Sequence, residues 1–222
     1  MIKEELFPSP DHDQLIDRVE EIRTELVEIP ASVLAERTGT IFLKHNDGKG
    51  KFQLDYWGEA VEITYPEFLM VDKKRQEKLS IFDQAMLAYY FRESDGTPQS
   101  GEWISFSDLP DGRFYAQAFH GYTSGPLVRT FGNNLEGFAN AARQLQGRQP
   151  WVAANLGDTS FVFPVLPHVS LLAVCWLGDE DFLSSYRVLF DSNIRHSLTT
   201  DACAILGSTL CRRLIKAFET AG

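Results

Sequence analysis

Apolar residues recur along the chain with two periods, one typical of helices and the other of strands. In residues 11–27, Leu15, Val19, Ile22 and Leu26 fall on one face of a helix. Helical spacing returns in four later segments: residues 31–36, residues from 80 onward, 133–146 and 200–218. Alternation typical of strands marks five segments: residues 40–44, 51–57, 60–65, 160–165 and 186–190.

These patterns predict an α+β fold with a mostly antiparallel sheet and packed helices. The three strand signals between residues 40 and 65 are separated by short turns, which predicts an antiparallel meander near the N-terminus. Residues 169–177 are almost all apolar, as expected of a strand that is buried on both faces. We expect residues 1–10 to be a flexible lead-in and residues 11–222 to form a single domain, within which residues 11–79 could form a subdomain.

Composition and charge narrow the classes of partner. The chain has 21 basic and 31 acidic residues, a formal charge of −10, which argues against nucleic-acid binding because that needs positive surface. The apolar run at residues 169–177 is far shorter than the roughly 20 residues of a membrane helix, so we expect no membrane association. Cys175, Cys203 and Cys211 form no C-x-x-C pair, which indicates buried free thiols and a cytoplasmic protein.

One central stretch concentrates the groups that could carry chemistry. Residues 101–122 read GEWISFSDLPDGRFYAQAFHGY. Residues 103–106 could form a short strand, and residues 108–112 are typical of a turn fixed by Pro and Gly. Residues 114–119 fit either a helix or an irregular segment. The aromatic residues of this stretch fit a core or the lining of an apolar pocket: Trp103, Phe106, Phe114, Tyr115, Phe119 and Tyr122.

The pocket interpretation predicts a ligand site in this stretch. Its candidate residues are Trp103, Asp111, Arg113, His120 and Tyr122. Arg113 could clamp a carboxylate or phosphate, and His120 could be a general base or an axial ligand to a corrinoid or haem. The structural alternatives are an Asp–Arg pair that locks the turn and a partly buried, hydrogen-bonded His120.

A second hypothesis places a divalent cation on the densest acidic group, which comprises Asp179, Glu180, Asp181 and Asp191. Adjacent carboxylates repel one another, and a hard cation would relieve that repulsion. The D-x-D-x-D-G loop pattern is absent, however, and consecutive side chains point in different directions, so a solvated turn after the central strand is the better explanation of these acids. The chain also lacks the G-x-S-x-G, G-x-x-x-x-G-K-[ST] and H-E-x-x-H motifs.

Several motifs together resemble one family. They are GEWISFSDLPDGRFY at residues 101–115, FPVLP at 163–167, GDEDF at 178–182 and LFDSN at 189–193. In this order they resemble domain of unknown function 3786, a family of bacterial and archaeal proteins found mostly in anaerobes. The resemblance runs from about residue 25 to the end. The segment TTDACAIL at 199–206 departs from the expected Thr-Glu-Asp-Ala pattern, so a role for a glutamate there does not transfer.

The resemblance implies anaerobic one-carbon or tetrapyrrole metabolism, because some relatives resemble fusions to an iron–sulfur domain of the kind found in corrinoid proteins. Three scattered cysteines cannot hold a four-cysteine cluster, so no iron–sulfur cluster is expected in this chain. The first hypothesis is therefore a non-catalytic small-ligand-binding or accessory protein, related to corrinoid or tetrapyrrole metabolism. The alternatives are a divalent-metal-dependent enzyme and a protein-interaction module that meets a protein partner.

Overall fold

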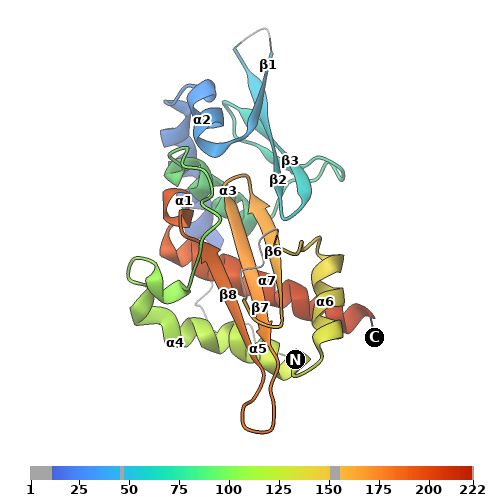
Figure 1. Ribbon diagram of the computed structural model, residues 1–222. Helices are drawn as coiled ribbons and strands as arrows, with labels where there is room; N and C mark the ends of the chain where they lie inside the picture. Colours follow the sequence, from blue (N-terminus) through green and yellow to red (C-terminus); the bar gives the residue numbers. More distant parts are fainter. Residues whose placement is uncertain (1–11, 46–47, 151–155, 222) are drawn as a thin grey trace. The chain divides into compact units, whose positions relative to one another are not determined.

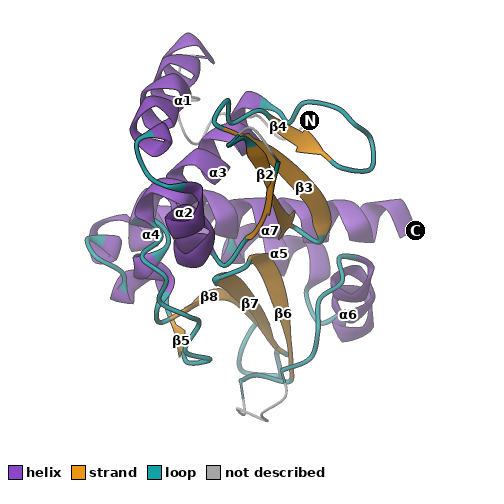
Figure 2. Ribbon diagram, turned by 90° about the horizontal axis from the view of Figure 1, so that it is seen from above, coloured by secondary structure: helices purple, strands orange, loops and turns teal. Residues whose placement is uncertain are grey.

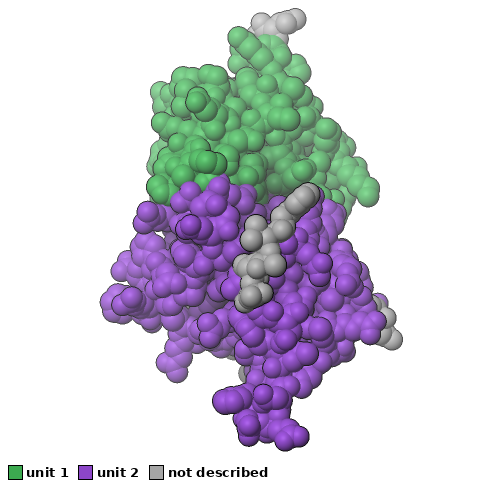
Figure 3. All heavy atoms as spheres, in the orientation of Figure 1, with its two compact units in different colours: residues 1–98, 166–168, 196–198 green, residues 99–165, 169–195, 199–222 purple. Residues whose placement is uncertain are grey.

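The computed structural model describes residues 12–45, 48–150 and 156–221. The chain divides into two compact units (Figure 3). The first unit comprises residues 1–98, 166–168 and 196–198, and the second comprises residues 99–165, 169–195 and 199–222. Helices and antiparallel sheets confirm the α+β class. The subdomain expected at residues 11–79 lies within the first unit, which extends further, and the lead-in at residues 1–10 lies outside the described residues.

The first unit places helices beside a four-stranded antiparallel sheet. The helices are α1 (His12–Val27), α2 (Ala31–Thr38) and α3 (Ile81–Glu93), and the strands are β1 (Ile41–Lys44), β2 (Gly50–Tyr56), β3 (Glu59–Tyr65) and β4 (Met70–Asp72). The strand order β1-β2-β3-β4 confirms the meander and extends it by one strand that the sequence pattern did not indicate. The helices lie on one side of this sheet in both views (Figures 1 and 2).

Local signals set the ends and inner faces of these elements. The Ser80 hydroxyl accepts a hydrogen bond from the Asp83 N–H at 3.2 Å, which caps the start of α3. Phe52, Leu54 and Tyr56 alternate along β2 and are all buried. The Phe52 ring contacts the Phe91 ring of α3, with 5.1 Å between their centroids, so aromatic contacts join the sheet to α3.

The second unit contains a second antiparallel sheet and four α-helices among its described residues. Its strands are β5 (Trp103–Ile104), β6 (Thr159–Leu166), β7 (Val169–Trp176) and β8 (Ser185–Asp191), in the order β5-β8-β7-β6. Its helices are α4 (Gly112–Tyr122), α5 (Ser124–Phe131), α6 (Leu135–Gln144) and α7 (Thr200–Ala221), and a 3-10 turn η1 (Phe106–Asp108) precedes α4. After β8, a further 3-10 turn η2 (Ile194–His196) leads into the segment 196–198 of the first unit. α7 runs across one face of the sheet (Figures 1 and 2).

Strand β7 is buried along almost its whole length, which confirms the prediction from its apolar run. On one face of the sheet, Leu172 and Val174 pack with Leu189 beneath four partly buried side chains: Trp103, Leu156, Val162 and Trp176. The helix side is rich in aromatic contacts, and there the Phe138 and Tyr186 ring centroids lie 5.3 Å apart. Burial on both faces explains why β7 is almost entirely apolar, with Ser170 as a buried polar exception.

Helix α5 was not predicted from the sequence. Its first turn contains Gly125 and Pro126, two residues that usually mark loops. A proline is tolerated in the first turn of a helix, because the N–H groups there have no partner within the helix. The side chains that hold α5 in place are Leu127 and Phe131, both buried.

A tight contact in the first unit depends on one glycine. Gly39 ends α2 with φ +63°, and a Cβ atom at this position would lie 2.7 Å from His168 Nε2. The N–H of His168 donates to the Tyr90 hydroxyl at 3.2 Å, and that hydroxyl donates to the Thr38 carbonyl at 2.7 Å. The end of α2 therefore packs directly against residues 166–168.

Gly39→Ala should lower the free energy of unfolding by about 2–3 kcal/mol, because it adds left-handed backbone strain to a clash with the His168 ring. Gly48→Ala is the matched control. Gly48 also has positive φ but nothing lies within 4 Å of its Cβ position, so the expected loss is about 1 kcal/mol. Urea unfolding followed by circular dichroism measures both. Equal losses would show that the His168 contact does not constrain this position.

His168 should make stability depend on pH. Its Nε2 atom is buried without a hydrogen-bond partner, and burial lowers its pKa below 6.5, opposed weakly by the charge of Asp95. Because the unfolded chain takes up a proton near pH 6.5 that the folded chain resists, the free energy of unfolding should fall as pH is lowered from 7 to 5.

The measurement is urea unfolding at several pH values in this range. His168→Gln should remove part of the pH dependence, whereas His45→Gln, a change at an exposed histidine, should retain it. A pH profile that His168→Gln leaves unchanged would contradict the assignment.

Candidate functional site

The central stretch folds as a short turn that leads into α4. The Asp108 carboxylate accepts hydrogen bonds from the Ser105 hydroxyl at 2.6 Å and the Ser105 N–H at 3.0 Å, which forms a capping box around η1. The Ser105 hydroxyl and N–H, with a smaller contribution from the charge of Arg113, hold the pKa of Asp108 below its usual value. Asp108 is therefore ionised at neutral pH and fixed in position.

Aromatic stacking anchors α4 to the rest of the second unit. The Phe119 ring stacks on the Phe106 ring with 4.2 Å between centroids and 9° between planes. Phe119 also contacts Phe190 of β8, with 5.8 Å between ring centroids. At Gly207 of α7, a Cβ atom would lie 2.8 Å from the Phe119 ring, so only glycine leaves room for this ring.

The outer surface of α4 exposes large aromatic side chains. Phe114 is 83% exposed and Tyr115 is 58% exposed, whereas Phe106 and Phe119 are buried. The aromatic residues of this stretch therefore divide between core and surface: the core interpretation is confirmed for Phe106 and Phe119, and the pocket interpretation stays a prediction.

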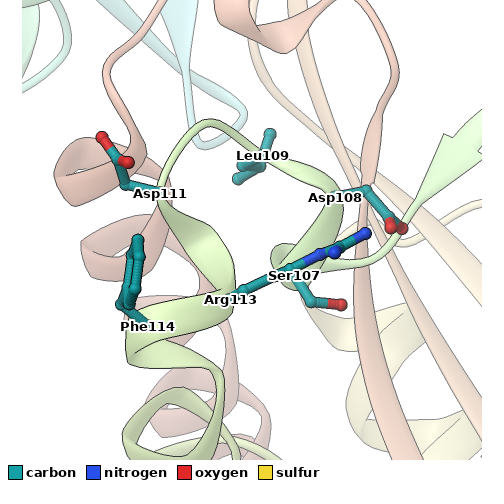
Figure 4. Close-up of a pocket in the computed structure, with 6 residues that line it drawn as sticks. All are labelled: Ser107, Asp108, Leu109, Asp111, Arg113 and Phe114. Carbon is teal, nitrogen blue, oxygen red and sulfur yellow. The ribbon is translucent and has the colours of Figure 1, made fainter.

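A depression of about 420 Å³ lies between η1, the following turn and the first turn of α4 (Figure 4). Six residues line it: Ser107, Asp108, Leu109, Asp111, Arg113 and Phe114. Figure 4 shows Arg113 extending past Ser107 toward Asp108, with Phe114 on the other side of the helix start. The depression thus combines a cation, two carboxylates, a hydroxyl and apolar surface.

Two of the expected ligand residues, Asp111 and Arg113, meet at this depression. Asp111 has a left-handed backbone with φ +58° and is exposed, and Arg113 is also exposed. No carboxylate lies within 4 Å of the Arg113 guanidinium among the ion pairs of the described residues, so the expected Asp–Arg lock is not formed as a close pair. Ser107 and Leu109 also line the depression but were not among the expected ligand residues. Nothing in the sequence distinguishes them except their position on either side of Asp108.

The helical geometry of α4 separates the other candidates. His120 lies two turns after Arg113 on the same flank, about 10 Å along the axis. It is exposed, and its Nδ1 lies 3.1 Å from the Ser124 hydroxyl oxygen. Tyr122 is about 200° around the helix from His120, so the two side chains cannot converge on one ligand. Tyr122 is half-buried, and burial together with the charge of Asp201 raises its pKa to about 12.

Trp103 lies away from the depression. It pairs with Asp191 across β5 and β8 and packs against the cluster of Leu172, Val174 and Leu189. Its place is therefore on the sheet face, and nothing in the structure brings it to the residues that line the depression.

The four acidic candidates are not brought together. Asp179, Glu180 and Asp181 precede β8 and are exposed, whereas Asp191 ends that strand and is buried. The length of a seven-residue strand, about 20 Å, separates the two ends. In the described part of the chain, no three His, Cys, Asp or Glu side chains are grouped so that they could hold a metal ion.

Asp191 instead ties β8 to the start of the central stretch. Its carboxylate accepts hydrogen bonds from the Gly101 N–H at 2.7 Å and from the Ser100 N–H and hydroxyl at 3.0 and 3.1 Å. The Asn193 N–H donates to the same carboxylate at 3.0 Å. A buried carboxylate that accepts four hydrogen bonds has a structural role. If the carboxylate is removed, each of the four donors loses its acceptor.

Asp191→Ala should lower the free energy of unfolding by about 3 kcal/mol, because it removes the buried carboxylate that accepts hydrogen bonds from three backbone N–H groups and the Ser100 hydroxyl. Asp181→Ala, which removes an exposed acid from the same unit, should change it by less than about 0.5 kcal/mol. Urea unfolding in the presence of a metal chelator measures the free energy of unfolding of both variants. If the two variants were equally stable, the structural role assigned to the Asp191 hydrogen bonds would be wrong.

The geometry defines an α+β protein with a shallow, charged and apolar depression at the start of one helix. Comparison with protein families then identifies the chain: the model of Domain of unknown function (DUF3786) matches residues 31–213, so the chain belongs to this family. Comparisons with curated proteins and with solved structures found no match. None of the helices among the described residues is both long and apolar enough to cross a membrane.

Proposed function

We propose that this protein is a non-catalytic binding protein that holds a small, flat, partly apolar anion in the depression at the start of α4. One observation carries the proposal: Arg113 and the 83% exposed Phe114, which are consecutive in the chain, both line a single depression. A phenyl ring offers a stacking surface, and a guanidinium offers two parallel hydrogen bonds to a carboxylate or phosphate.

The lining favours binding over catalysis. Its six residues include no histidine, cysteine or lysine, and Asp108 already accepts two hydrogen bonds from Ser105. A general base needs a pKa near the working pH, which Asp108 lacks because its pKa is lowered. An accessory role, in which the ligand is held or delivered, fits this set of side chains.

A corrinoid or another tetrapyrrole is the ligand class that we propose. Such a ligand combines a broad apolar ring with carboxylate or amide edges, which suits Phe114 and Arg113 together. His120 is exposed on the same flank of α4 as Arg113 and offers an imidazole to a metal at the centre of a macrocycle. The family resemblance to proteins of anaerobes supports a place in anaerobic metabolism.

The cysteines and the net charge of the chain support proposals about its cellular location and its partners. Three buried, free cysteines suit a reducing compartment, so we place the protein in the cytoplasm. The charge of −10 disfavours nucleic acid as a partner, and we propose none and no membrane. The alternative of a divalent-metal-dependent enzyme gains no support from the separated acidic residues.

The test is titration of the purified protein with three probes: haem, cobalamin and the apolar anion 8-anilinonaphthalene-1-sulfonate. Visible absorbance reports the macrocycles and fluorescence reports the third probe. Phe114→Ala and Arg113→Gln should each weaken binding about tenfold or more. His120→Ala should abolish only the spectral shift of a coordinated metal.

Matched controls on the same unit are Tyr115→Ala and Arg129→Gln, which alter residues outside the depression. Both should bind the probes like the unmodified protein. If neither macrocycle changed its spectrum, the tetrapyrrole assignment would be wrong, and if no probe distinguished Phe114→Ala from Tyr115→Ala, the site itself would be wrong.

A further inference from the structure

The loop between β7 and β8, residues 177–184, carries two adjacent apolar side chains in the solvent. Phe182 is 74% exposed and Leu183 is 90% exposed. Figure 1 shows this loop extending beyond the ends of both strands. Single exposed apolar residues are common, but two large neighbours at the tip of a projecting loop are typical of a contact surface.

Hydrogen bonds give the loop a defined shape. The Asp179 carboxylate accepts from the N–H groups of Asp181 at 2.9 Å and Phe182 at 2.8 Å, and the Asp179 N–H donates to the Phe182 carbonyl at 2.9 Å. The loop base is held by Asn133, whose side chain accepts from the Gly178 N–H at 2.8 Å and donates to the Gly178 carbonyl at 3.2 Å. A loop that is ordered before it binds loses less entropy on binding.

Three carboxylates border the apolar tip. Asp179, Glu180 and Asp181 precede Phe182 directly and are all exposed. Their charges disfavour three classes of partner. Anionic lipid and nucleic acid would be repelled, and a second copy of the chain carries a charge of −10 of its own. A projecting tip also offers no cavity for a small molecule.

We propose that this loop is a docking element, whose Phe182 and Leu183 insert into an apolar pocket on a partner protein that is bordered by lysine or arginine. The apolar pair supplies the central anchor, and the three carboxylates pair with the basic border and orient the approach. Because eight residues bury little surface, the complex should be transient unless neighbouring surface also contributes. This docking element is separate from the α4 depression and does not depend on the function proposed for it.

Photo-crosslinking identifies the partner in cells that express the full chain. The probe is p-benzoylphenylalanine, introduced as Leu183→p-benzoylphenylalanine, and the control places it at Tyr115, an exposed aromatic position on α4 of the same unit. The protein that crosslinks at position 183 alone is identified by mass spectrometry and purified. Isothermal titration calorimetry then measures its affinity for the unmodified chain and for variants.

Phe182→Ala and Leu183→Ala should each weaken binding about tenfold or more, because both remove an anchor. The hydrogen bonds of Phe182 with Asp179 involve only its backbone atoms, so the loop keeps its shape. Glu180→Lys with Asp181→Lys should slow association and invert its dependence on salt, because the added lysines repel the basic border of the pocket. Tyr115→Ala, which alters an exposed aromatic residue of α4 outside the depression, should bind the partner normally.

A glycine substitution tests the loop shape itself. At Gly178 a Cβ atom would lie 2.5 Å from the Ser184 nitrogen and 2.6 Å from the Phe182 oxygen, so Gly178→Ala must distort the loop while it leaves both anchors present. Its binding should be weaker by about tenfold, with an unchanged circular dichroism spectrum of the whole protein.

Four results would overturn the proposal. The first two concern crosslinking: no protein crosslinks more at position 183 than at position 115, or the crosslinked protein is a second copy of the chain. The other two concern binding: the protein binds anionic phospholipid vesicles in a way that needs Phe182, or the identified partner binds Phe182→Ala and Leu183→Ala with unchanged affinity.

Discussion

The stacking of Phe119 on Phe106 is the contact on which the α4 surface depends. The Phe119 ring lies between Phe106, Phe190 of β8 and the gap that Gly207 leaves in α7. With this ring fixed, the inner face of α4 is determined, and every other residue of the helix takes its direction from it. Phe114 is exposed because Phe119 is buried, since the two positions are about 140° apart around the helix axis.

Much of the fold could be predicted because its signals are local. The cap at Ser80, the alternation of β2 and the apolar run of β7 each depend on residues within a few positions of one another. Helix α5 could not be predicted, because Gly125 and Pro126 resemble a loop and only burial of Leu127 and Phe131 stabilises the helix. The division into units could not be predicted either, since residues 166–168 and 196–198 join the first unit from far along the chain.

The candidate site was predictable in its location but not in its membership. Residues 101–122 stand out in the sequence, and two of the candidates within them, Asp111 and Arg113, line the depression. Whether residues 114–119 form a helix decides which side chains share a face, and the sequence allowed either conformation. The helix separates Tyr122 from His120, and the pairing of β5 with β8 places Trp103 on the sheet. Asp191 looked like a cation ligand because a sequence shows a charge without the N–H groups that surround it.

The hydrogen bonds of Asp191 have a consequence for how the protein is made. They join residues 90 and 91 positions apart, so Gly101 and Ser100 find their partner only after β8 exists. During synthesis from the N-terminus, β5 therefore cannot pair with β8 until about ninety further residues have been added to the chain. The surface of α4, which the same stretch leads into, is completed late in translation, and a nascent chain that stops before β8 would present its aromatic residues without their support.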